Sequence, residues 1–99
     1  MTMYYVMIEG YPKESNPEIN EVEGAYIDIW VKTGSAEDAV EKAKAYVDEE
    51  DWETDHIESV SEVKREDYAD EPDSLEAFDE AIEKGISAVF YTWESEEER

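Results

Sequence analysis

Residues 25–32 alternate strictly between small or aliphatic side chains and larger or polar ones, and this pattern restricts the fold more than any other. Successive side chains of a β-strand point to opposite faces of a sheet. One face receives Ala25, Ile27, Ile29 and Val31. The other face receives Tyr26, Asp28, Trp30 and Lys32. The segment therefore predicts a β-strand whose aliphatic side is covered by another layer.

Three further segments, 3–9, 52–64 and 86–93, are rich in β-branched and aromatic residues and predict additional strands. In the segment 52–64, Ile57, Val60 and Val63 lie three residues apart and break the two-residue period. A β-bulge near Glu58 or Ser59 would restore the pattern. Residues 11–24 contain two prolines and a glycine, which predict a long loop between the first two strands.

Two segments have the spacing of amphipathic helices. Ser35 followed by Asp38 resembles a capping box and predicts a helix that begins there and continues to about residue 49. Asp73 with Glu76 predicts the start of a second helix, and Gly85 is expected to end it as a C-terminal cap.

The resulting order of elements is β-β-α-β-α-β, within a single domain that spans residues 1–99. We expect an α+β two-layer sandwich, in which two helices lie on one face of a four-stranded sheet and crossover connections join the later strands. These layers resemble the ferredoxin-like architecture, although that fold has the order β-α-β-β-α-β. Residues 94–99 are expected to form a flexible acidic tail.

Charge limits the partners of the chain. It has 30 Asp and Glu against 8 Lys and Arg, a formal charge of −22. Affinity for phosphate backbones or anionic lipid comes from Lys and Arg, so direct nucleic-acid or membrane binding is not expected. Basic proteins are attracted instead. The chain has no cysteine, and its start lacks the pattern of a signal peptide, so a cytoplasmic location is expected.

Much of the acidity is concentrated in one third of the chain. Residues 48–83 hold 17 carboxylates against Lys64 and Arg65. An acidic rim that meets a basic partner is expected to consist of Asp48, Glu49, Glu50, Asp51, Asp67, Asp70, Glu71 and Asp73. The hypothesis is a non-enzymatic protein-binding domain that acts as an inhibitor, an immunity-type protein or a DNA mimic. The alternative is that the acidity only keeps the chain in solution.

An aromatic face is the second candidate site. If the helices cover the aliphatic side of the strand 25–32, the opposite face presents Tyr5, Tyr26, Trp30, Tyr91 and Trp93. Such a face is suited to a homodimer or a partner interface, or to the wall of a small-molecule pocket. Three other outcomes stay open: the loop 11–24 covers the face, the tail covers it, or these residues form ordinary cross-strand pairs.

The sequence offers little for catalysis or metal binding. His56 is the only histidine, and its neighbours Asp55 and Glu58 would orient it only if the bulge redirected them. No calcium loop is present, and zinc is disfavoured because there is one imidazole and no thiolate. We therefore expect no enzyme activity, no cofactor and no metal.

Overall fold

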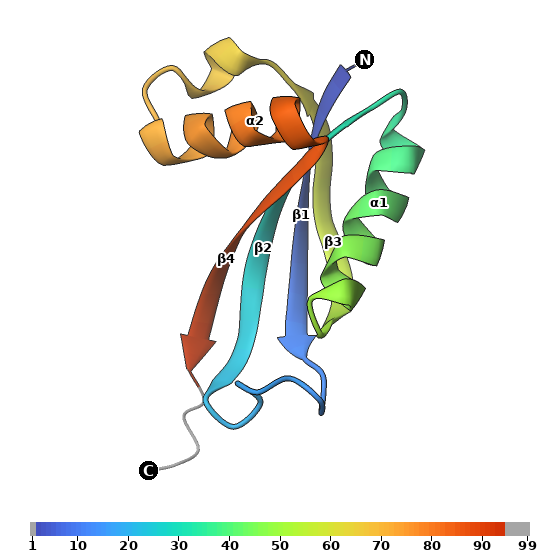
Figure 1. Cartoon of the computed structure of the whole chain (residues 1–99), viewed down its shortest axis with the longest axis vertical. Helices are drawn as coiled ribbons and strands as arrows, with labels where there is room; N and C mark the ends of the chain where they lie inside the picture. Colours follow the sequence, from blue (N-terminus) through green and yellow to red (C-terminus); the bar gives the residue numbers. More distant parts are fainter. Residues whose placement is uncertain (1, 95–99) are drawn as a thin grey trace.

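The computed structural model describes residues 2–94 and has the expected α+β class and order of elements (Figure 1). The four strands are β1 (Thr2–Pro12), β2 (Val22–Thr33), β3 (Trp52–Val63) and β4 (Ile86–Glu94). The helices are α1 (Ala36–Glu49), α2 (Pro72–Lys84) and a short 3₁₀ helix, η1 (Arg65–Tyr68). Neither α-helix in this part of the chain has the length and apolar character needed to cross a membrane.

The strands form one sheet in the order β3-β1-β2-β4, and each neighbouring pair is antiparallel. It follows that β2 and β3 run in the same direction with β1 between them, so α1 must run back along the sheet to join them. The strands β3 and β4 lie at opposite edges and run in opposite directions. Helix α2 therefore joins them across one end of the sheet, and the expected second crossover is wrong.

Helix α1 covers the aliphatic face predicted for β2. Three buried residues at helical spacing, Ala39, Ala43 and Val47, pack with Ile27 and Ile29. Val6 and Ile8 of β1 belong to the same cluster and are fully buried. The small alanines allow the helix to lie close to the sheet, so this cluster is the main core.

Helix α2 does not share this face, and its position differs from the expected arrangement of both helices on one side. Its buried residues Ala77, Phe78 and Ala81 pack with Met3 and Trp30. Trp30 lies between Ile29 and Val31 in β2, so its side chain points to the opposite face. The sequence pattern did not reveal this because the α2 stripe fits either face, and the connection across the end of the sheet determines which one it covers.

The first two strands are longer than expected, which shortens the loop between them to residues 13–21. The first strand was expected to stop at Gly10, and Gly24 was counted among the turn residues of the loop, but both glycines lie inside strands. A Cβ atom on Gly10 would lie 2.6 Å from the carbonyl oxygen of Glu53 in β3. Gly10 therefore serves a close approach of two strands rather than a turn.

The helix ends follow the sequence signals with one exception. The Ser35 side chain accepts a hydrogen bond from the Asp38 amide at 3.1 Å, and Gly85 ends α2 with φ 96°. Helix α2 begins earlier than the predicted Asp73 cap because Pro72 occupies its first turn, where a missing N–H costs nothing. Of the predicted tail, Glu94 belongs to β4, and residues 95–99 lie outside the described part.

Candidate functional site

The eight residues of the predicted acidic rim do not form one surface. Asp48–Asp51 lie where α1 ends and β3 begins, whereas Asp67–Asp73 lie beyond the other end of β3. Twelve residues of strand separate them by on the order of 36 Å, in a molecule whose longest extent is 45 Å. The expectation of a single rim is therefore wrong, because β3 is extended along its whole length.

The first of these groups belongs to a larger acidic surface that we call the loop end. It comprises the loop 13–21, the α1–β3 turn and the adjoining strand ends, at the bottom of Figure 1. Among residues 2–94, the loop end contains one basic residue, Lys13, which forms an ion pair with Asp48. The carboxylates of the loop end are Glu14, Glu18, Glu21, Glu23, Asp48, Glu49, Glu50, Asp51, Glu53 and Glu94.

The loop end is tied together by hydrogen bonds to one residue. The carbonyl oxygen of Asp51 accepts bonds from the Lys13 amide at 3.0 Å and from Asn16 Nδ2 at 2.9 Å. Asn16 is buried, and its Oδ1 accepts a bond from the Glu18 amide at 2.8 Å. Asp51 adopts a left-handed backbone with φ 68°, a conformation that Asp tolerates better than most residues. The acidic side chains therefore project from a fixed backbone.

The five residues of the predicted aromatic face do share one side of the sheet. The register pairs Tyr5 with Trp30, Trp30 with Ser87, and Tyr26 with Tyr91. Helix α2 and η1 cover the end of this side that includes Tyr5 and Trp30. The aromatic residues are thereby divided into a covered pair and an open group.

The covered pair, Tyr5 and Trp30, belongs to the hydrophobic cluster between α2 and the sheet. Trp30 is 1% exposed, and its Nε1 donates a hydrogen bond to the Tyr68 hydroxyl at 3.1 Å. Its ring lies 5.4 Å from that of Tyr5, centroid to centroid. The Tyr5 hydroxyl donates to Asp28 at 2.8 Å, and burial raises the pKa values of both groups. Tyr5 and Trp30 therefore stabilise the position of α2 and are not a docking surface.

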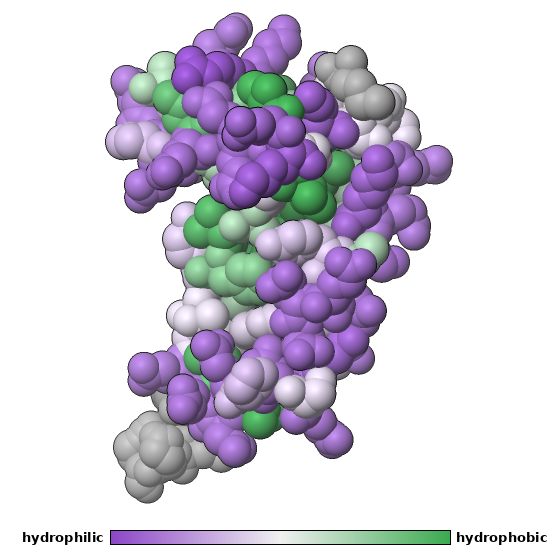
Figure 2. Space-filling model, in the orientation of Figure 1, coloured by the Kyte–Doolittle hydropathy of each residue, from purple (hydrophilic) through white to green (hydrophobic). Residues whose placement is uncertain are grey.

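The open group is Tyr26, Tyr91 and Trp93. Tyr26 is 40% exposed and Tyr91 51% exposed, while Trp93 is half-buried against Tyr26 with ring centroids 5.2 Å apart. Figure 2 shows hydrophilic side chains over much of the molecule and a narrower strip of hydrophobic residues over the sheet. A homodimer through the aromatic face stays a prediction.

Two bulges in β3 place carboxylates next to His56 that regular strand spacing would not direct at it. The register with β1 shifts between Met7 and Ile8, which leaves Glu58 unpaired and confirms the predicted bulge. A second shift, between Glu9 and Gly10, leaves Asp55 unpaired. His56 lies between the two bulges and directly opposite Glu9.

The bulges direct carboxylates at both nitrogens of the His56 ring. Asp55 Oδ2 lies 3.1 Å from Nδ1, and Glu58 Oε2 lies 2.6 Å from Nε2. Glu9 Oε1 is 3.5 Å from Nε2. The hydrogen bonds that the ring donates, to Asp55 first and then to Glu58, raise the pKa of His56. The arrangement is a histidine between three carboxylates at an exposed edge of the sheet.

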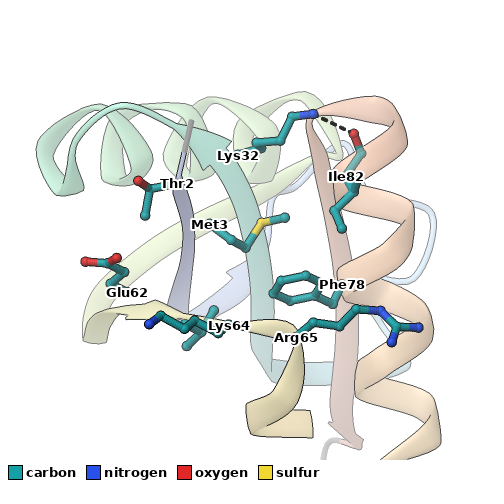
Figure 3. Close-up of a pocket in the computed structure, with 9 residues that line it drawn as sticks. Thr2, Met3, Lys32, Glu62, Lys64, Arg65, Phe78 and Ile82 are labelled. Carbon is teal, nitrogen blue, oxygen red and sulfur yellow. Dashed lines mark hydrogen bonds between the residues drawn. The ribbon is translucent and has the colours of Figure 1, made fainter. Parts of the chain in front are cut away.

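A cavity of about 360 Å³ opens beside α2, and the sequence analysis did not anticipate it. Figure 3 shows Met3 and Phe78 between the strands and the helix, and Lys32 directed at the Ile82 carbonyl oxygen, 2.8 Å away. Lys64 and Arg65 also line the cavity. The only sequence signal was the adjacency of Lys64 and Arg65 in an acidic region, because the contribution of Lys32 depends on where α2 crosses the sheet.

Comparison with known proteins yielded no significant match to a family model, a curated protein or a solved structure.

Proposed function

We propose that this chain is a non-enzymatic binding domain whose loop end docks onto a basic surface of a protein partner, as an inhibitor or a DNA mimic does. The single observation that carries the proposal is the fixed scaffold of the loop end. Ten carboxylates and one paired lysine, counted within residues 2–94, project from the loop, the turn and the adjoining ends of helix and strands, and Asn16 and Asp51 join the loop to the turn. A preorganised surface loses less conformational entropy on binding than a mobile one.

The position of these acids also argues against a purely stabilising role. Asp48 and Glu49 occupy the last turn of α1, which has no basic residue. The C-terminal end of a helix carries partial negative charge, so carboxylates there reduce stability. A charge of −22 also exceeds the magnitude of about 2–8 that keeps a small domain soluble. Because these charges reduce the stability of the fold, their presence is better explained by a role in binding than by a role in folding.

The test is association with a basic protein, for which lysozyme is a suitable probe, followed by light scattering or calorimetry across a salt series. We expect binding that weakens steeply as salt rises, because paired charges at a surface are screened. A variant carrying Glu14→Lys, Glu18→Lys and Glu50→Lys is expected to bind at least tenfold more weakly. The native partner is then sought with the immobilised chain and elution by salt.

The matched control reverses three exposed acids elsewhere, Glu37→Lys, Glu41→Lys and Glu76→Lys. Both variants change the net charge equally. If the two lose affinity to the same extent, the attraction belongs to the whole molecule and the loop end is not a specific site.

The cavity beside α2 supports a second function, binding of a small anionic molecule with an apolar part. Its size falls within the range of ligand pockets, and its apolar floor is bordered by three of the eight basic residues of the chain. A thermal-shift series with small carboxylates and phosphate esters tests it. Lys64→Ala should abolish the shift, whereas Lys44→Ala on α1 should leave it unchanged. If neither variant changes the shift, the cavity is not the site.

A further inference from the structure

The cluster around His56 presents three metal-ligand atoms close together. His56 Nε2 and one carboxylate oxygen each from Glu9 and Glu58 all lie within 4.8 Å of one another. We propose that these three residues bind a Zn²⁺ ion and that solvent completes its coordination. This site is independent of the proposed docking of the loop end.

The distances suit a zinc ion with small adjustments. Zinc binds histidine nitrogen and carboxylate oxygen at about 2.0–2.2 Å, so neighbouring ligand atoms of a tetrahedral site lie roughly 3.4 Å apart. Glu9 Oε1 is already 3.5 Å from Nε2, and Glu58 Oε2 is 2.6 Å from it. A small rotation of the Glu58 side chain, which moves its oxygen by less than 1 Å, would give this spacing.

Asp55 supplies the outer contact that metal-binding histidines typically have. Its Oδ2 lies 3.1 Å from Nδ1, where it accepts the proton of that nitrogen. A zinc ion would displace the proton between Nε2 and Glu58 and take its place at the Nε2 lone pair. Such a carboxylate fixes the tautomer and orientation of a metal-bound imidazole. The cluster thus contains both the ligands of a metal site and the outer carboxylate that orients the histidine ligand.

The backbone is built irregularly at this point. A bulge removes a residue from the pairing of two strands and redirects a side chain, and such bulges are common beside functional sites. In β3, the two bulged residues are Asp55 and Glu58, which contact His56. Without the bulges, Asp55 would point away from the face that His56 shares with Glu9.

The donor set favours zinc over magnesium or calcium. Those two ions prefer sites made of oxygen alone, whereas an imidazole nitrogen suits zinc, nickel and copper. The side chains of His56, Glu9 and Glu58 are 50%, 27% and 36% exposed, so an ion and its water can reach them. Residue types alone, one imidazole and no thiolate, disfavoured zinc, because the positions that the bulges create cannot be read from residue types.

The test uses nuclear magnetic resonance of the ring, because the single histidine gives one set of imidazole signals. Titration with Zn²⁺ in a non-chelating buffer should shift the Nε2 signal of His56 with saturation at one ion per chain. Mg²⁺ at the same ionic strength should leave the signal in place. A ring signal unchanged by zinc, or shifted equally by magnesium, overturns the proposal.

Matched variants separate this site from general attraction of cations to an acidic chain. Glu9→Gln with Glu58→Gln should lower zinc affinity more than tenfold. Glu53→Gln with Glu62→Gln removes the same charge from β3 outside the cluster and should change affinity less than threefold. Asp55→Asn should weaken binding by about 10–100-fold, as loss of an outer-shell partner does. Equal losses in the two double variants would contradict the site, whether or not the loop end binds a basic protein.

Discussion

At the scale of single residues, Gly10 provides a sharp test of the sheet. A Cβ atom there would approach the Glu53 carbonyl oxygen to 2.6 Å, and backbone atoms cannot yield as a flexible side chain can. Gly10→Ala is therefore expected to lower the free energy of unfolding by about 1–3 kcal/mol, as overpacking does. Urea denaturation followed by circular dichroism measures this. Gly34→Ala is the control, because beyond its two chain neighbours no atom lies within 4 Å of its Cβ position. An equal loss there would show that the close approach at Gly10 is not the cause.

Asp28 predicts a dependence of stability on pH. Burial is the main cause of its raised pKa, and the hydrogen bond from Tyr5 partly opposes it. The folded chain therefore holds this proton more tightly than the unfolded chain, whose pKa is about 3.9. The contribution favours folding below that pH and is lost as the pH rises through the folded pKa, so the ionised group opposes folding at pH 7.

The substitution Asp28→Asn should consequently raise the urea midpoint at pH 7, because its amide oxygen can still accept from Tyr5. The gain should shrink toward zero as the pH falls to 4 and below. Asp70→Asn, at an exposed carboxylate, controls for the loss of one charge. A lower midpoint at pH 7, or a difference that does not change with pH, would show that the Asp28 charge is not the cause.

At the scale of elements, the position of α2 is tested by the aromatic residues of the sheet. Trp30 is buried under this helix, whereas Tyr91 is 51% exposed on the same face. Trp30→Ala is expected to cost about 3–5 kcal/mol of unfolding free energy, as for a large side chain removed from a core. Tyr91→Ala should cost less than about 1 kcal/mol. Similar costs at the two positions in urea denaturation would mean that α2 does not cover Trp30.

Asn16 predicts how the loop end is held. Its side chain joins the 13–21 loop to the carbonyl oxygen of Asp51 and to the Glu18 amide. Asn16→Ala removes both bonds and leaves the Glu18 amide without its acceptor, while the Asp51 oxygen keeps the Lys13 amide. We therefore expect a loss of about 1–3 kcal/mol. Faster amide hydrogen exchange should appear in residues 13–21 and not in α2. Exchange that increases equally everywhere would indicate a general loss of stability instead of a local tether.

The elements themselves could be predicted because local patterns determine them. The alternation of 25–32, the cap at Ser35 and the spacing that required a bulge near Glu58 all reflect interactions within a few residues. The face covered by α2 could not be predicted, since it depends on which strands lie at the edges of the sheet. For the same reason, Gly10 was expected to end a strand and Gly24 to form a turn, whereas each allows a close contact with another strand.

In the candidate sites, too, features that depend on local patterns could be predicted and features that depend on long-range contacts could not. The common side of Tyr26, Trp30 and Tyr91 followed from strand periodicity. The separation of the acidic rim into two groups follows from the length of the strand predicted over 52–64, although the sequence analysis did not convert that length into a distance. The meeting of Glu9 with His56 depends instead on pairing between two strands that are about 40 residues apart in sequence. No local pattern contains that information.

At the scale of the whole molecule, charge is distributed unequally between the two ends of the sheet. Four of the eight basic residues lie at the end where α2 crosses: Lys32, Lys64 and Arg65 line the cavity beside this helix, and Lys84 lies in its last turn. The loop end contrasts with this, since Lys13 is its basic residue within the described chain. A basic partner would therefore meet the loop end in a preferred orientation, because the field directs association.

The most direct test of this account is a ¹H–¹⁵N map of the chain titrated with a lysine-rich peptide. We expect chemical-shift changes concentrated in residues 13–21 and 48–53, reversed by added salt and absent from the variant with Glu14→Lys, Glu18→Lys and Glu50→Lys. Changes spread evenly over the exposed carboxylates, or centred on η1 and α2, would contradict the claim that the loop end is the binding surface.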